Sequence, residues 1–72
     1  MMEYFEQATI RVYQKNEDFP QGYLMGRADQ DADGKWISVV YVEEDNLTIV
    51  RNLGMAENQE AALALIYEEL KK

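Results

Sequence analysis

The chain has 72 residues, of which 47% are hydrophobic, and it carries a formal net charge of −7 with no cysteine and no histidine. This length allows one domain, and a domain this short buries only about 60% of the surface that its unfolded chain exposes. The absent side chains exclude disulfides, thiolate and imidazole metal sites, and any Cys or His nucleophile or base. The acidic charge argues against nucleic-acid phosphates as a target and favours a basic protein partner.

The N-terminal half of the chain predicts three strands in succession. Residues 5–15 alternate in polarity and contain β-branched and aromatic side chains, as a half-buried strand does. Residues 16–22 hold the only proline together with a glycine and predict a hairpin loop. A second strand is expected over residues 22–29. The turn-forming Asp31-Ala32-Asp33-Gly34 then leads to a third strand, residues 35–43, whose apolar density indicates a central position.

The C-terminal part predicts a short strand and one helix. Residues 47–52 are expected to form the strand, which Asn52-Leu53-Gly54 would end. Asn58 is a credible N-cap for a helix over residues 59–71. At 100° per residue the apolar side of this helix carries Ala62, Leu63, Ile66, Tyr67 and Leu70. We therefore expect an α+β fold, an antiparallel three- to four-stranded meander with one C-terminal helix packed on one face.

The two faces of the predicted sheet differ in composition. Alternation assigns to the face under the helix the side chains Ala8, Ile10, Val12, Leu24, Ala28, Ile37, Val39 and Tyr41. It assigns to the other face Arg11, Tyr13, Lys15, Tyr23, Met25, Arg27, Trp36 and Ser38. A single helix covers only one side of a sheet, so the second set is expected to remain as an open platform of rings and cations.

This platform is the main candidate for a binding site. Aromatic residues, Met and Arg are enriched at protein interfaces, so we predict a partner-binding surface formed by Arg11, Tyr13, Tyr23, Met25, Arg27, Trp36 and Ser38. Rings and cations on a sheet can also stack on bases and pair with phosphates in single-stranded nucleic acid. A third interpretation is that these residues merely favour strands and cover Lys and Arg stems on a solvated face.

One segment resembles part of a calcium-binding loop. The run Asp29-Gln30-Asp31-Ala32-Asp33-Gly34 places oxygen ligands at alternate positions before a glycine. The bidentate carboxylate that such a loop needs at its twelfth position falls on Val40, inside a predicted strand. We therefore assign no metal site and leave open only a weak ion site at Asp29, Asp31 and Asp33.

Acidic side chains gather in the predicted turns, at Glu17-Asp18 and Glu43-Glu44-Asp45, and along the helix. Carboxylates spaced on a rigid scaffold can imitate a phosphate backbone, although charged turns more often keep strand ends soluble. Adjacent exposed carboxylates without a pocket do not form a catalytic site. We expect no enzymatic activity and no cofactor.

Short fragments of the chain resemble two families. Gly34-Lys35-Trp36, Leu53-Gly54 and Glu60-Ala61-Ala62 resemble the DNA-binding sheet domain of plant ethylene-response factors and the arm-binding module of tyrosine recombinases. That resemblance implies DNA reading by Arg11, Arg27 and Trp36, but those domains are basic. The acidic charge and the Glu-Ala helix start also resemble HicB-type antitoxins, which neutralise a toxin of the double-stranded-RNA-binding kind. Each resemblance spans about two thirds of the chain and is one of fold only.

Together these patterns predict a small, acidic, non-catalytic binding or inhibitory protein that recognises a macromolecular partner, preferably a protein, through the open sheet face. The alternatives are a nucleic-acid-binding sheet domain, an acidic antitoxin or nucleic-acid mimic, and a homodimer formed through the same face. The residues up to Tyr13 are too polar for a signal peptide or a membrane span, so we expect a cytoplasmic protein that does not bind membranes.

Overall fold

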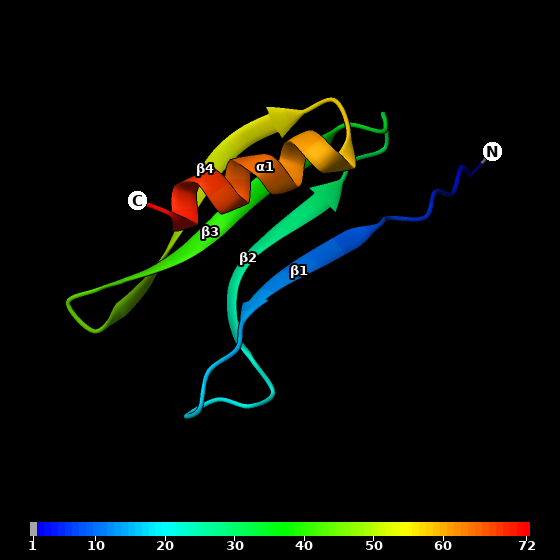
Figure 1. The fold of residues 1–72 in the computed structure, drawn as a ribbon. Coiled ribbons are helices and arrows are strands. Elements are labelled where there is room, and N and C mark those ends of the chain that lie inside the picture. Colours follow the sequence, from blue (N-terminus) through cyan, green and yellow to red (C-terminus); the bar gives the residue numbers. More distant parts are fainter. Residues whose placement is uncertain (1) are drawn as a thin grey trace.

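The structure is a computed structural model that describes residues 2–72. Along the chain lie β1 (Thr9–Gln14), β2 (Tyr23–Gln30), β3 (Trp36–Glu44), β4 (Leu47–Ala56) and α1 (Gln59–Leu70). The four strands form one sheet in chain order, every neighbouring pair is antiparallel, and α1 lies across one face (Figure 1). The predicted α+β meander with a C-terminal helix is confirmed.

Local signals account for the two tight turns of the sheet. Between β2 and β3, the Gly34 N–H donates to the Asp31 carbonyl oxygen at 3.1 Å, and Gly34 adopts a φ of +86°. This is a type I turn closed by a left-handed residue, for which glycine carries no steric penalty. Between β3 and β4, Asp45 and Asn46 have φ values of 50° and 67°. Two consecutive left-handed residues form the type I′ turn that matches the twist of a hairpin.

β4 is longer than predicted: it continues to Ala56, whereas the predicted strand ended at residue 52. Ser38 of β3 pairs with Gly54 and Val39 pairs with Asn52, so Leu53 has no residue opposite it. Gly54 adopts a φ of +99°, and its N–H donates to the Asn52 side-chain oxygen at 2.7 Å. The glycine that we interpreted as a strand end is thus part of a β-bulge in a continuing strand.

The core lies between α1 and the sheet. Its buried apolar side chains are Ala28, Trp36, Val40, Ala62 and Ile66. The helix begins where predicted, because the Asn58 side chain accepts a hydrogen bond from the Ala61 N–H at 2.9 Å. A Cβ at Gly26 would lie 2.9 Å from the Val39 carbonyl oxygen and 3.0 Å from Cγ2 of Ile66. Glycine at this position therefore allows the helix to approach the sheet closely.

β3 faces the opposite way from our prediction. Trp36 and Ser38 are 6% and 0% exposed and lie under α1, where the Ser38 hydroxyl donates to the Ala62 carbonyl oxygen at 2.9 Å. Ile37, Val39 and Tyr41, which alternate with them, are on the uncovered side. The prediction that Trp36 and Ser38 belong to the open platform is wrong.

The pairing of β2 with β3 explains this reversal. Directly opposite residues share a face, and Ala28 lies opposite Ser38 while Gln30 lies opposite Trp36. Because Ala28 is buried, Ser38 also faces the core. Because apolar residues occupy both sides of β3, alternation within this strand alone could not show which side faces the helix.

Candidate functional site

The sheet face that α1 does not cover, here called the open face, is rich in apolar side chains. Cross-strand pairing places Ile37 beside Met55, and Tyr41 beside Val50, on this face. None of its large apolar side chains is buried, and the set comprises Met25, Ile37, Val39, Tyr41, Val50 and Met55. Large exposed apolar patches mark interaction sites on proteins.

The cations of the open face differ in their partners. Arg11 of β1 lies opposite Arg27 of β2. Arg27 Nε is 2.8 Å from Asp29 Oδ2, and the Thr9 hydroxyl donates to Asp29 Oδ1 at 2.7 Å. Among residues 2–72, no carboxylate forms an ion pair with Arg11. The charge of Arg27 is therefore balanced within the sheet, whereas Arg11 is available to a partner.

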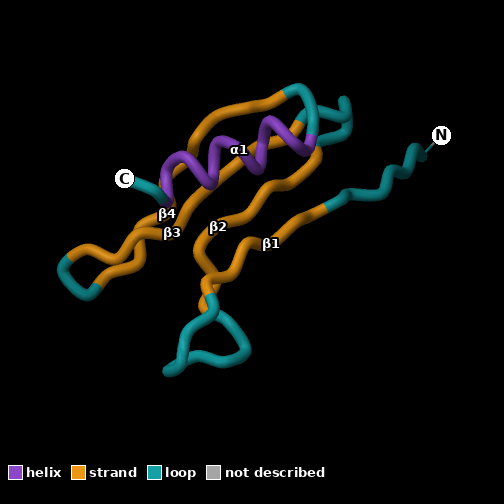
Figure 2. Tube along the Cα trace, viewed as in Figure 1, coloured by secondary structure: helices purple, strands orange, loops and turns teal. Residues whose placement is uncertain are grey.

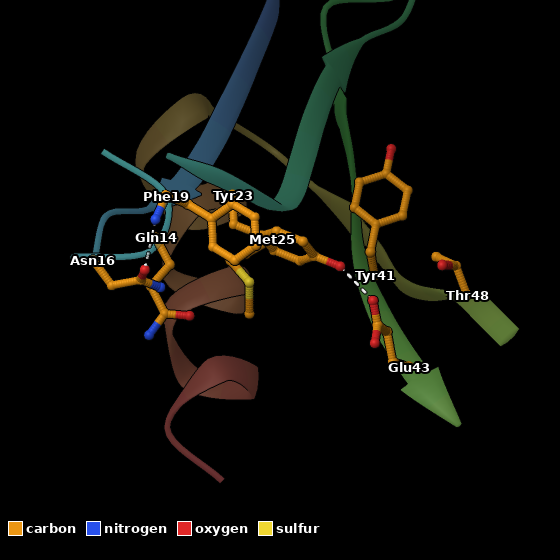
Figure 3. A pocket seen from close by; sticks show the side chains of 8 residues that line it. All are labelled: Gln14, Asn16, Phe19, Tyr23, Met25, Tyr41, Glu43 and Thr48. Atoms are coloured by element: carbon orange, nitrogen blue, oxygen red, sulfur yellow. Dashed lines mark hydrogen bonds between the residues drawn. The ribbon is translucent and has the colours of Figure 1, made fainter. Parts of the chain in front are cut away.

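The open face deepens where the two hairpins separate. Pairing between β2 and β3 stops at Gly26 and Val40, and beyond that point the β1–β2 and β3–β4 hairpins diverge (Figure 2). An open hollow of about 470 Å³, here called the fork hollow, lies between them. Both hairpins line it, through Gln14, Asn16, Phe19, Tyr23, Met25, Tyr41, Glu43 and Thr48 (Figure 3).

Aromatic rings and one carboxylate dominate the fork hollow. The ring centroids of Phe19 and Tyr23 are 5.5 Å apart with planes tilted by 57°, and the Phe19 N–H donates to the Asn16 side chain at 2.9 Å. The Tyr23 hydroxyl donates across the gap to the Glu43 carboxylate (Figure 3). This hydrogen bond, and then the negative charge of Glu43, raise the pKa of Tyr23 above its ordinary value. The hydrogen bond links the two hairpins at the mouth of the fork.

A smaller hollow of about 260 Å³ lies between β1, β2 and the last turn of α1. Val12 pairs with Gly26 and Tyr13 pairs with Leu24, so Met25 has no residue opposite it and forms a bulge. Met25 lines both hollows. Gln14 also lines both, whereas Tyr13 lines only the smaller one, together with Val12, Tyr67 and Leu70.

The predicted site residues thus fall into four places, one of which is the core. Arg11, Met25 and Arg27 lie on the open face; Tyr23 and Met25 line the fork hollow, and Tyr13 is beside α1. Trp36 and Ser38 are buried in the core. The recombinase-type resemblance would need Trp36 for DNA contact, and its burial removes it from that set.

Sequence reasoning missed several residues of this surface. Tyr41 and its neighbours on β3 were assigned to the core by the same phase error that misplaced Trp36. Phe19 was placed in a predicted loop and Glu43 among the acidic side chains of a turn, and neither was assigned to the open platform, although both line the fork hollow. The single sequence signal for Phe19 is an aromatic residue directly before proline in a polar loop.

The aspartates of the β2–β3 turn shape the backbone. Asp31 Oδ1 accepts hydrogen bonds from the N–H groups of Asp33 and Lys35 at 2.9 and 3.0 Å. The Asp29 carboxylate is occupied by the Thr9 hydroxyl and Arg27. Among residues 2–72, no three acidic side chains are grouped so that they could hold a metal ion.

The part of the chain that the structure describes contains no helix with the length and apolar content needed to cross a membrane. Comparison with known proteins gives no significant match to a family model, a curated protein or a solved structure. Any function must therefore be inferred from the surface of this molecule alone.

Proposed function

We propose that this protein is a small, non-catalytic binding protein that holds a basic protein partner on its open face, with a lysine or arginine side chain of the partner seated in the fork hollow. The observation that carries the proposal is the uncovered apolar surface on β3 and β4, centred on Val39 and Tyr41. A small domain that leaves this much apolar surface in water gains stability when a partner covers it.

The distribution of charge favours a basic partner. Exposed acids occupy both hairpin tips that flank the fork hollow, Glu17 and Asp18 on one and Glu44 and Asp45 on the other. Together with the net charge of −7, they attract a cationic surface toward the open face. Within the hollow, aromatic faces attract a cation and also pack against the stem of a long side chain, while Glu43 supplies an opposite charge.

The same charges disfavour a nucleic acid. Arg27 is already paired with Asp29, and Trp36 is buried, so Arg11 is the remaining cation of the predicted DNA-reading set. One free cation releases few counterions from a phosphate backbone, and the surrounding carboxylates repel it.

The test compares two tyrosines that lie in different environments. Tyr41→Ala removes a ring from the open face, whereas Tyr4→Ala removes a ring that is 84% exposed and precedes β1. We expect immobilised wild-type protein and Tyr4→Ala to retain the same basic protein from extracts of the native host, and Tyr41→Ala to lose about 10-fold or more in affinity for it. Retention of that protein by Tyr41→Ala at wild-type strength, or capture of no basic protein by any variant, would rule out the proposal.

A second variant tests the seat for a cation. Glu43→Gln keeps the size of the side chain but removes its charge. We expect a weaker affinity and a smaller dependence of binding on salt, because a charge pair is lost at the fork. The pKa of Tyr23, followed by NMR, should also fall toward its ordinary value, which confirms that the intended contact was changed. An unchanged salt dependence would place the cation elsewhere.

A further inference from the structure

The outer edge of β4 is the second exposed surface of this molecule. β4 is the last strand of the sheet, so within residues 2–72 no other strand pairs with its outer side (Figure 1). It is also the longest strand, with ten residues. Its outward-pointing N–H and carbonyl groups therefore form a row that can pair with another strand.

The first half of β4 exposes apolar side chains on both faces of the sheet. Leu47, Ile49 and Val50 are 67%, 41% and 58% exposed. Ile49 lies opposite Val42, which packs on the core, so Ile49 and Leu47 point to the helix side, whereas Val50 points to the open face. A molecule that packs on only one face of the sheet would leave the apolar side chains on the other face exposed to water. A strand added at the edge contacts both sides, because its own side chains alternate between them.

The opposite edge of the sheet, β1, is protected against pairing with another strand. This difference indicates that β4 is the edge better suited to pair. β1 has six residues, with the exposed Arg11 within it and Lys15 directly after it, and charged residues on an edge strand discourage pairing. In residues 47–51 the only charge is on Arg51, and its Nη1 is 2.8 Å from Glu69 Oε1 of α1. The bulge at Leu53 interrupts the second half of β4, so residues 47–51 are the segment free to pair.

We propose that residues 47–51 of β4 pair antiparallel with the same segment of a second copy, so that two four-stranded sheets become one continuous sheet. A twofold axis at Ile49 sets Leu47 opposite Arg51 of the second copy and Thr48 opposite its Val50. No like charges then face each other. Arg51 is paired with Glu69 of its own chain, so the joined segments bring no unpaired charges together although each chain carries −7.

This arrangement uses the strand edge and leaves the open face free. The twofold axis is perpendicular to the sheet, so both helices lie on one side and both open faces lie on the other. Two partner-binding faces side by side would strengthen attachment to a partner that presents repeated sites. The pairing itself does not depend on the proposed binding of a basic protein.

The experiment measures mass against concentration for three proteins. By sedimentation equilibrium we expect the wild type to pass from 8.4 kDa to twice that mass, with a dissociation constant of about micromolar order. Leu47→Lys with Ile49→Lys should stay monomeric at every concentration. The control, Tyr4→Lys with Phe5→Lys, adds the same charge at exposed residues away from the edge and should dimerise as the wild type does.

Hydrogen exchange on the wild type provides a second measurement that needs no variant. At high concentration, and not at low, every second amide from Leu47 to Arg51 should become protected, because outward-pointing N–H groups alternate along a strand. A wild type that remains monomeric at millimolar concentration would overturn the proposal. If the double lysine variant still dimerises, the contact does not lie at residues 47–51 and the proposal is overturned. If Tyr41→Ala abolishes the dimer, the contact lies on the open face and the proposal is likewise overturned.

Discussion

The two sides of β3 show how differently the same kind of side chain can behave in one strand. On the side under α1, Trp36, Ser38 and Val40 are buried, and the Ser38 hydroxyl has a partner in the helix. On the other side, Ile37 and Val39 are just as apolar but remain partly exposed because nothing in residues 2–72 covers them. Apolar character alone therefore does not identify the core of this protein, since the position of one helix decides which set of residues is buried and which set remains exposed.

The largest expected effect comes from truncating adjacent residues on opposite faces. Trp36→Ala should lower the free energy of unfolding by about 3–5 kcal/mol, because it removes the largest side chain of the core. Ile37→Ala should lower it by less than about 1.5 kcal/mol, because its side chain already contacts water. Urea denaturation of both variants measures the difference. Equal losses would contradict the assigned facing of β3.

Gly26→Ala tests how closely the covered face approaches the helix. The added Cβ would meet the Val39 carbonyl oxygen at 2.9 Å and Ile66 Cγ2 at 3.0 Å, so backbone or helix must move. We expect a loss of about 1–3 kcal/mol in the free energy of unfolding, as for other overpacked cores. A neutral or stabilising result in thermal and urea unfolding would show that α1 packs on the sheet more loosely than these two distances indicate.

Removing one hydroxyl on the covered side of the sheet and one exposed hydroxyl should change the free energy of unfolding by smaller amounts. Ser38→Ala removes a buried hydrogen bond to the Ala62 carbonyl oxygen and should cost about 1 kcal/mol. Thr48→Val removes an exposed hydroxyl beside the fork hollow and should change the free energy of unfolding by less than about 0.5 kcal/mol. We expect urea denaturation to show the larger loss for Ser38→Ala. A larger loss for Thr48→Val would contradict this prediction.

The smallest effect concerns the ion pair that joins the last turn of α1 to β4. Hydrogen bonds from Arg51 and then Lys72 lower the pKa of Glu69 below its ordinary value. A lowered carboxyl pKa contributes stability above the unfolded pKa, and this contribution is lost as the pH falls through the folded pKa. Arg51→Ala should therefore melt slightly below the wild type at neutral pH, and the two melting temperatures should converge in acid. A difference that persists in acid would show that packing of the arginine stem, not its charge, causes it.

Features with a local cause could be predicted from the residues alone. Asn58 marks the start of α1 because capping depends on the next few backbone groups, and Gly34 marks a turn because it takes up a left-handed conformation. The facing of β1 and β2 as far as their bulge was also predictable, since Ile10 and Ala28 alternate with Arg11 and Arg27. In this part of the two strands polarity distinguishes the two sides. Beyond the bulge, Tyr13 was expected on the open platform but lies beside α1.

Other features depend on a neighbouring strand. Gly54 has the same local signature at a strand end and in a bulge, and only its pairing with Ser38 distinguishes the two. Tyr23 and Glu43 are 20 residues apart, and they meet because the hairpins diverge at Gly26 and Val40. No spacing rule within one strand could have predicted the fork hollow.

The order of residues by itself determined a meander of three to four strands followed by a helix, because turns, caps and strand-forming side chains act over a few residues. Only the tertiary structure decided that Trp36 supports the core and that Ile37, Val39 and Tyr41 face outward. The physical reason lies in β3 itself: both of its sides are apolar, so either could exclude water, and the register with β2 selects the one that the helix covers.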